Sequence, residues 1–232
     1  EGGTRTERQL LRRHGVADVM NHYYQDSAVT IYNGDCRQIL PALGEFDLLL
    51  TDPPYGIGAD NQKQILSRGK KAKAKDYGKQ NWDSSTVEDW LLLLALSKAS
   101  NQIIFGGNYY NLPPSQCWLV WDKQNGENDF ADCEMAWTNY RKSIRLKSHL
   151  WNGMIRKNNE ERFHPTQKPL EIMTWALTFA GEDAKTIIDP FAGSGTTGRA
   201  AKDLGRQAVL IEREEKYCEI AAKRMAQEVL PL

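Results

Sequence analysis

From residue 28 onward, short apolar runs alternate with longer segments of helical periodicity. The apolar runs predict strands over residues 29–33, 46–51, 102–105, 117–121, 185–189 and 207–212. The segments between them predict helices over residues 37–43, 87–100, 167–180, 197–204 and 214–229. Several of the strands are apolar throughout, which is typical of parallel strands that helices cover on both faces. The pattern therefore predicts an α/β fold with an open, doubly wound sheet.

Two further short runs, 134–138 and 143–150, indicate a pair of strands at an edge of the sheet. Residues 1–27 are polar, and we interpret them as an N-terminal extension. The remainder, residues 28–232, contains no internal repeat and no clear linker, so we expect it to form one domain.

A glycine-rich turn follows the strand that ends in Asp189, with the sequence Pro190-Phe191-Ala192-Gly193-Ser194-Gly195-Thr196-Thr197. The two glycines let the backbone pass close to a ligand, and Thr196 or Thr197 can cap the following helix. The next strand ends in Glu212, where α/β nucleotide sites place an acid for ribose hydroxyls. The turn lacks the third glycine of a dinucleotide loop and the lysine of a phosphate-binding loop. It indicates an adenosine ligand without a phosphate chain, or else a simple glycine turn near a surface glutamate.

A second turn, Asp52-Pro53-Pro54-Tyr55, follows the buried strand 46–51. The prolines fix the backbone and remove two donors, so local carbonyl groups face outward without partners. A carboxylate, a free carbonyl and an aromatic ring together suit an amino group on a flat ring. Asp52 and the Pro53 carbonyl can accept hydrogen bonds from both of its N–H groups, and Tyr55 can stack on the ring. Such acceptors direct the nitrogen lone pair toward an electrophile. The alternative is a proline-rich turn with a surface tyrosine.

The 232-residue chain has no net charge, with 30 basic and 30 acidic residues, but its charge is unevenly distributed. Basic residues concentrate in a loop over residues 58–80 and in the segment 141–168. They favour a polyanionic partner such as nucleic acid, with two solvated lysine-rich loops as an equal alternative.

The cysteines and histidines lack metal-site spacing, so we expect no bound metal. The longest apolar run, 91–96, is too short to span a membrane and no signal segment opens the sequence, so we expect a cytoplasmic protein.

In combination, these motifs resemble those of the β-class amino-DNA methyltransferases, which methylate adenine-N6 or cytosine-N4 with S-adenosylmethionine. The similarity extends from about residue 24 to residue 226. The turn at residues 52–55 is similar to the catalytic motif of this class, and its position ahead of the glycine loop is the order that characterises the class. Two more segments add to the resemblance, Asn33-Gly34-Asp35-Cys36 and His164-Pro165-Thr166-Gln167-Lys168-Pro169.

The resemblance implies a role for each matching residue. The catalytic residues are Asp52, Pro53, Pro54 and Tyr55. The cofactor-binding residues are Asp35, Cys36, Asp189, Phe191, Ala192, Gly193, Ser194, Gly195, Thr196, Thr197, Glu212, His164, Thr166 and Lys168. The basic residues expected to contact DNA are Lys63, Arg68, Lys70, Lys71, Lys73, Lys75, Lys79, Arg141, Lys142, Arg145 and Lys147. Trp137 and Tyr140 are further candidates for the wall of a base pocket.

The resemblance also implies a Rossmann-like mixed sheet with helices on both faces and an antiparallel hairpin at one edge. The implied reaction moves a methyl group from S-adenosylmethionine to the amino group of a base that is flipped out of double-stranded DNA. It leaves S-adenosylhomocysteine and needs no metal. The segment 141–163 is shorter than the target-recognition segment of such enzymes. We therefore expect specificity to come from this small insert, from the loop over residues 63–79 or from the second subunit of a homodimer, with low sequence specificity as the alternative.

Asp rather than Ser at position 52 favours adenine-N6 as the acceptor within this class. Cytosine-N4 stays open as an alternative, because the two chemistries share one motif. An inactive DNA-binding or cofactor-binding subunit and a methyltransferase for RNA or protein glutamine are less favoured. The resemblance further implies a bacterial or phage-encoded enzyme that acts on the nucleoid, with or without a partner restriction nuclease.

Overall fold

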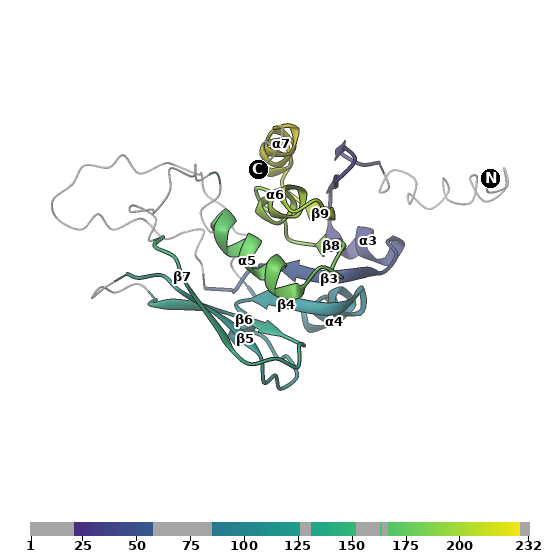
Figure 1. Cartoon of the computed structure of the whole chain (residues 1–232). Helices are drawn as coiled ribbons and strands as arrows, with labels where there is room; N and C mark the ends of the chain where they lie inside the picture. Colours follow the sequence, from purple (N-terminus) through teal and green to yellow (C-terminus); the bar gives the residue numbers. More distant parts are fainter. Residues whose placement is uncertain (1–20, 58–84, 126–130, 152–162, 164–166, 228–232) are drawn as a thin grey trace.

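A nine-stranded mixed sheet runs through the described part of the chain, in the order β1-β2-β9-β8-β3-β4-β6-β5-β7 (Figure 1). The structure is a computed structural model and describes residues 21–57, 85–125, 131–151, 163 and 167–227. The strands are β1 Tyr24–Gln25, β2 Val29–Asn33, β3 Phe46–Thr51, β4 Ala99–Phe105, β5 Trp118–Asp122, β6 Cys133–Thr138, β7 Arg145–Ser148, β8 Thr186–Asp189 and β9 Gln207–Glu212. The α-helices are α3 Cys36–Ile39, α4 Asp89–Ser97, α5 Leu170–Ala180, α6 Thr196–Asp203 and α7 Glu215–Ala226. Two short 3-10 helices are η1 Leu40–Ala42 and η2 Gly107–Tyr109.

Five neighbouring strands in this sheet, β2, β9, β8, β3 and β4, run parallel. Their side chains alternate between two apolar clusters, as β3 illustrates: Leu48 and Leu50 belong to one and Leu49 to the other. Residues of α5, α6 and α7 complete the first cluster, and residues of α3 and α4 complete the second. The predicted α/β sheet with helices on both faces is therefore confirmed. Because parallel strands end at the same edge, the turns after β2, β3, β8 and β9 meet there.

None of the helices in the described ranges combines the length and apolar character that crossing a bilayer requires.

The antiparallel hairpin implied by the family resemblance is formed by β5 and β6, which extend the sheet beyond β4. β6 pairs with β4 on one side and with β5 on the other, while β7 pairs with β5 in parallel at the outer edge. The predicted direct pairing of 134–138 with 143–150 is therefore wrong, although both segments contain strands. Burial distinguishes the two strands. Ala136 and Trp137 are buried because β6 lies between two neighbouring strands, whereas Leu146 is 66% exposed because β7 is an edge strand.

Two of the differences from the predicted elements affect the sheet. The helix expected over 87–100 ends at Ser97, because the Lys98 carbonyl accepts from the Phe46 N–H at 2.8 Å and the chain joins the sheet as β4. At the other end of the sheet, β1 pairs antiparallel with β2. The sheet therefore begins inside the segment 1–27, which was expected to be an extension. Residues 1–20 of that segment lie outside the described residues.

Candidate active site

The Asp-Pro-Pro-Tyr turn, residues 52–55, leaves the carboxyl end of β3 in the middle of the sheet; we call it the catalytic turn after its predicted role. The fully buried residues of β3 anchor the strand, so core packing sets where the turn begins. The Tyr110 hydroxyl donates to the Pro54 carbonyl, so this carbonyl is paired, contrary to the expectation of unpartnered carbonyls. Among the described residues, no donor pairs with the Pro53 carbonyl, which leaves that oxygen as an acceptor.

Two donors hold the Asp52 carboxylate in place. Its Oδ2 accepts from the Lys168 ammonium at 2.6 Å, and its Oδ1 accepts from the Tyr55 hydroxyl. Lys168 Nζ also donates to the Tyr55 hydroxyl oxygen at 3.2 Å. The three side chains form a closed triangle that fixes the orientation of the carboxylate. Lys168 was predicted to be a cofactor residue, and in the structure it also contacts the catalytic turn.

Two charged residues at this site were not predicted from the sequence, Glu134 on β6 and Lys123 after β5. Glu134 Oε2 lies 3.0 Å from Lys168 Nζ, and Glu134 Oε1 pairs with Lys123. Asp52, Lys168, Glu134 and Lys123 thus form a chain of alternating charges, which we call the charge cluster. The one available signal for Glu134 was a carboxylate within a predicted strand, because no local motif marks it.

Burial and mutual proximity shift the pKa values in the charge cluster. Burial raises the pKa of Asp52, and the Glu134 charge adds to this effect while Lys168 opposes it. Burial also acts to raise the pKa of Glu134, but Lys168 and Lys123 outweigh it and lower that pKa to about 2. Burial acts to lower the pKa of Lys168, but Asp52 and Glu134 outweigh it and raise that pKa. The ammonium of Lys168 therefore stays charged at neutral pH, and Asp52 is the more easily protonated of the two carboxylates.

The turn after β4 holds the ring of Tyr55. Gly106 adopts φ 64°, and a Cβ added there would lie 2.0 Å from Cε1 of the Tyr55 ring. Tyr109 stacks on Tyr55, with ring centroids 4.9 Å apart and planes 13° apart. Tyr109 is 45% exposed, so an aromatic face borders the catalytic turn. Trp137 and Tyr140, the residues predicted to wall a base pocket, are not part of this stacked pair.

Trp137 and Tyr140 take part in packing contacts of the two apolar clusters. Trp137 is buried in the cluster on the α3 and α4 face, and its Nε1 donates to the Pro113 carbonyl at 2.8 Å. Tyr140 packs edge-on against Phe179 of α5, with ring centroids 5.3 Å apart. The structure therefore does not support the prediction that these two residues wall a base pocket.

The glycine loop connects β8 to α6 in a conformation that requires glycine. Gly195 adopts φ 78°, and a Cβ added there would lie 2.7 Å from the Cβ of Ala221 on α7. Gly195 occupies the cap position of α6, with no side-chain cap bond. The predicted capping by Thr196 or Thr197 is therefore wrong, because both hydroxyls bond to buried partners instead.

One of these partners is Asp189, a buried hydrogen-bond centre at the end of β8. Its Oδ1 accepts from Thr51 Oγ1 at 2.7 Å and from the Phe191 N–H at 3.1 Å, and its Oδ2 accepts from Thr197 Oγ1 at 2.5 Å. Burial raises the pKa of Asp189 to about 6, although these hydrogen bonds oppose the rise. Asp189 thus ties β3, β8 and α6 together and sets the shape of the loop.

The other partner is Arg224, a buried arginine of α7 that supports the loop from behind. Its Nη1 donates to the Ser194 carbonyl at 2.8 Å and to Thr196 Oγ1 at 3.1 Å. Ser194 Oγ in turn donates to Gln167 Oε1 at 3.1 Å. The support of the loop by Arg224 and Gln167 was not predicted from the sequence, because both contacts depend on tertiary packing.

Glu212 ends β9 beside the glycine loop. Its Oε2 accepts from the Gly193 N–H at 2.8 Å, and its Oε1 accepts from the Glu214 N–H at 2.7 Å. Each oxygen keeps a lone pair that can accept from a further hydroxyl. Burial raises the pKa of Glu212 to about 6.

Asp35 and Cys36 follow β2 at the same edge of the sheet. Asp35 caps α3 by accepting from the Arg37 N–H at 2.9 Å, and it also accepts from Arg37 Nε at 2.8 Å. The pairing with Arg37 lowers the pKa of Asp35. Burial raises the pKa of Cys36 to about 12, so its thiol presents an uncharged surface. Both residues are suited to packing beside a ligand rather than to reacting with it.

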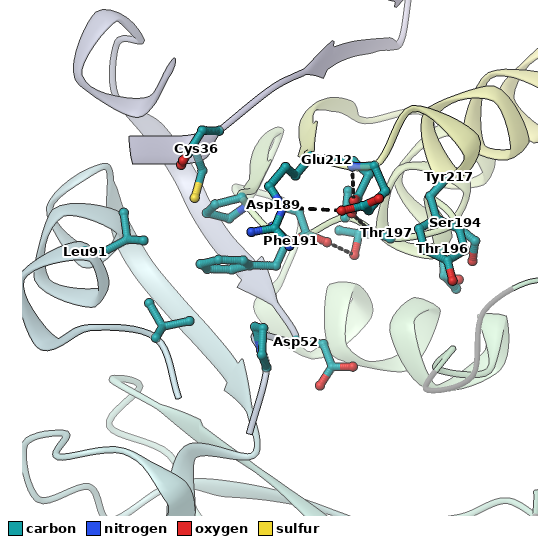
Figure 2. A pocket seen from close by; sticks show the side chains of 18 of the residues that line it. Cys36, Asp52, Leu91, Asp189, Phe191, Ser194, Thr196, Thr197, Glu212 and Tyr217 are labelled. Carbon is teal, nitrogen blue, oxygen red and sulfur yellow. Dashed lines mark hydrogen bonds and ion pairs between the residues drawn. The ribbon is translucent and has the colours of Figure 1, made fainter. Parts of the chain in front are cut away.

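A single cavity of about 310 Å³ joins these motifs, and Figure 2 shows Asp52 below Phe191, Asp189 and Glu212. This volume is within the usual range for small-molecule pockets, roughly 300–1,000 Å³. Val87, Leu91, Met173 and Phe191 add apolar walls. Among the described residues, no three His, Cys, Asp or Glu side chains form a group that could hold a metal ion. The predicted site residues that line the cavity are Asp35, Cys36, Asp52, Pro54, Lys168, Asp189, Phe191, Ala192, Gly193, Ser194, Thr196, Thr197 and Glu212.

The residues predicted to bind DNA are described only in part. Lys142 Nζ donates to the Phe179 carbonyl at 3.0 Å, and Lys147 pairs with Glu171 at 2.9 Å. Arg141 and Arg145 are exposed. The following predicted residues lie outside the described ranges: His164, Thr166, Lys63, Arg68, Lys70, Lys71, Lys73, Lys75 and Lys79.

Comparison with known proteins places these observations in a family. A family model for a DNA methylase matches residues 107–223, about half of the chain. The type II methyltransferase M2.LlaDCHI of Lactococcus lactis subsp. cremoris is 42% identical over 262 aligned positions, which cover 92% of this chain and 95% of that protein. The type II methyltransferase M.HinfI of Haemophilus influenzae is 27% identical over 258 positions, which cover 89% of this chain and 71% of that protein.

Two solved structures share the fold. The complex of M1.HpyAVI with SAM has a TM-score of 0.57 at 21% identity and covers 86% of this chain and 100% of that one. The cytosine-N4-specific PvuII DNA methyltransferase has a TM-score of 0.56 at 16% identity and covers 91% of this chain and 92% of that one. At these identities the likeness concerns the fold alone, and it agrees with the Rossmann-like mixed sheet.

Proposed function

This chain belongs to the N6/N4 family of amino-DNA methyltransferases, and from that premise we propose that it methylates adenine at N6 in double-stranded DNA, with S-adenosylmethionine as the donor. The supporting observation is the cavity that joins Asp52 to Glu212 and the glycine loop. One end of this cavity offers acceptors for an amine, and the other offers groups for a nucleoside.

The residues that line the cavity suit S-adenosylmethionine, a donor that has no phosphate group. Glu212 has free lone pairs for the ribose hydroxyls, and Cys36 and Phe191 offer uncharged surface for the adenine. The glycine loop, held by Asp189 and Arg224, would border the methionine part. The bound donor supplies a sulfonium whose methyl group is already a strong electrophile.

The catalytic turn would bind the target amine. Asp52 and the Pro53 carbonyl would accept hydrogen bonds from its two N–H groups, which directs the nitrogen lone pair toward the methyl group. The fixed carboxylate of Asp52 then stabilises the positive charge that develops on the nitrogen. The amine loses one proton after transfer, and the nearest acceptor is an Asp52 oxygen, whose pKa is raised by burial.

The base must leave the duplex to reach this turn. Flipping costs a few kcal/mol, and stacking on an aromatic ring returns roughly 1–3 kcal/mol per base. Tyr55, backed by Gly106 and Tyr109, would supply that ring. Contacts to phosphates from Arg141, Arg145 and the basic loop 58–80 would supply further binding energy.

Adenine-N6 is favoured over cytosine-N4 because position 52 is Asp. Mass analysis of digested DNA after incubation with the protein and labelled S-adenosylmethionine tests this assignment. We expect labelled N6-methyladenine. Labelled N4-methylcytosine alone would reverse the choice of base, and unlabelled DNA would contradict the proposed function itself.

The Glu212→Gln variant should bind S-adenosylmethionine about 10- to 100-fold more weakly, because a charge-assisted hydrogen bond is worth about 1.5–3 kcal/mol. Burial raises the pKa of Glu212 to about 6. The wild-type affinity should therefore fall as the pH drops through about 6 and the carboxylate that accepts from the ribose is protonated. Isothermal titration calorimetry at several pH values measures both effects.

The Glu219→Gln variant is the matched control, because Glu219 pairs with Lys223 on the exposed side of α7. It should bind the donor as the wild type does, with the same pH dependence. If Glu212→Gln retained the wild-type affinity at pH 8, Glu212 would not be a ribose ligand.

We also propose a homodimer, with the short segment 141–163 of each copy sharing one DNA site. The exposed side chains of Ile144 and Leu146 lie at the start of this segment, on the outer edge of the sheet. Sedimentation equilibrium should give twice the chain mass. A monomer at micromolar concentration would contradict this proposal.

A further inference from the structure

The charge cluster joins the catalytic turn to a part of the fold that carries none of the family motifs. Asp52 and Tyr55 belong to the turn after β3, and Lys168 precedes α5. Glu134 and Lys123 belong to the β5–β6 hairpin, which reaches the turn only through the sheet. The hairpin therefore places one carboxylate and one ammonium group beside the reacting centre.

Lys168 is shared between two carboxylates. Its Nζ lies 2.6 Å from Asp52 Oδ2 and 3.0 Å from Glu134 Oε2, and its side chain is only 6% exposed. Lys123 holds the other oxygen of Glu134, and Lys123 Nζ also lies 5.2 Å from the centre of the Trp121 ring. Glu134 thus has a fixed position on the hairpin and supplies a second anchor for the Lys168 ammonium.

We propose that Glu134, held by Lys123, is a positioning residue for methyl transfer: it anchors Lys168 so that Lys168 orients the Asp52 carboxylate while leaving Asp52 able to bind the target amine. The proposal rests on the proposed function. Without Glu134, Asp52 would be the only carboxylate bound to this buried ammonium. Lys168, already 2.6 Å from Asp52 Oδ2, would then pair with Asp52 alone, and this stronger ion pair would compete with the amine for the Asp52 oxygens.

The same arrangement predicts opposite effects of the two hairpin residues on the titration of Asp52. The other titratable groups that face the cluster are Tyr55, Tyr110 and Asp189. Glu134 contributes a negative charge that raises the pKa of Asp52, so its removal lowers this pKa. Lys123 offsets part of that charge, so its removal raises the pKa of Asp52.

The test compares Glu134→Gln with Lys123→Gln in the full chain, at saturating donor and DNA. Glu134→Gln should lower kcat about 10- to 100-fold through misplacement of Asp52, while the affinity for S-adenosylmethionine changes less than about twofold. The acid limb of its kcat profile should move to lower pH by roughly half a unit or more. Lys123→Gln should move the acid limb to higher pH.

Glu219→Gln controls for the loss of a surface carboxylate and should leave kcat and its pH profile unchanged. Acid limbs that stay in place, or that move in the same direction in both variants, would overturn the proposal. If Glu134→Gln does not fold, the direction of the Lys123→Gln shift alone decides: a shift to higher pH supports the proposal, and any other result overturns it.

Carboxyl ¹³C NMR can follow the Asp52 titration without DNA or donor, with Asp52→Ala identifying its signal. Opposite shifts of this signal in the two hairpin variants would support the electrostatic part of the proposal even if wild-type protein transferred no methyl group to DNA. A failure of the proposed function is thereby distinguished from a failure of the present proposal.

Discussion

The Asp52→Ala variant will transfer methyl groups about a thousandfold more slowly than the wild type, because it loses the charge that stabilises the developing ammonium. Its affinity for S-adenosylmethionine should stay within a factor of about three, since the residues that we propose to bind this donor are Glu212 and the glycine loop. The fold should survive, because Lys168 keeps Glu134 as a partner. Single-turnover transfer of labelled methyl to DNA measures the rate, and calorimetry measures donor binding.

The matched control for this prediction is Asp183→Ala. Asp183 is exposed and lies ahead of β8, at the end of the strand opposite Asp189. This variant should transfer methyl at the wild-type rate. Equal rates for Asp52→Ala and the wild type would rule out the role that we assign to Asp52.

The Gly106→Ala variant will lose both stability and activity. The alanine Cβ would lie 2.0 Å from the Tyr55 ring, at a residue whose φ of 64° disfavours side chains. The left-handed conformation costs about 1–2 kcal/mol, and overpacking costs about 1–3 kcal/mol. We therefore expect a melting temperature lower by about 5–10 °C. Displacement of Tyr55 and of its bond to Asp52 should lower kcat about a hundredfold.

Gly44→Ala tests whether this loss is specific to the position. A Cβ added at Gly44 meets no atom within 4 Å, so this variant should match or slightly exceed the wild type in stability and keep its activity. Thermal unfolding and methyl transfer are measured for both variants. A Gly106→Ala protein with wild-type melting temperature and rate would show that Tyr55 is not held by this turn.

Local sequence was sufficient to predict the parallel core and most of the cavity. The apolar runs at β2, β3, β8 and β9 are long enough to predict strands buried on both faces. The motifs that follow them then had to meet, because parallel strands end at one edge of the sheet. Asp52, Asp189 and Glu212, which the sequence motifs and the family resemblance assigned to one site, do line one cavity.

The predictions that failed concern interactions between distant segments. The capping role of Thr196 and Thr197 was plausible from local preference, but the buried groups of Asp189 and Arg224 use these hydroxyls. The pairing of β6 depended on which strands lie beside it, and a pattern of period two contains no such information.

The sequence by itself determined the type of fold, the catalytic turn and the glycine loop, because strand burial and turn chemistry are encoded within a few consecutive residues. Only the tertiary structure decided that Lys168 joins Asp52 to Glu134, and that Gly106 supports Tyr55. These contacts join residues that are far apart in the chain, and they depend on the order of the strands. The energy of a buried charge depends on its neighbours in space, and these neighbours are defined only once the sheet has formed.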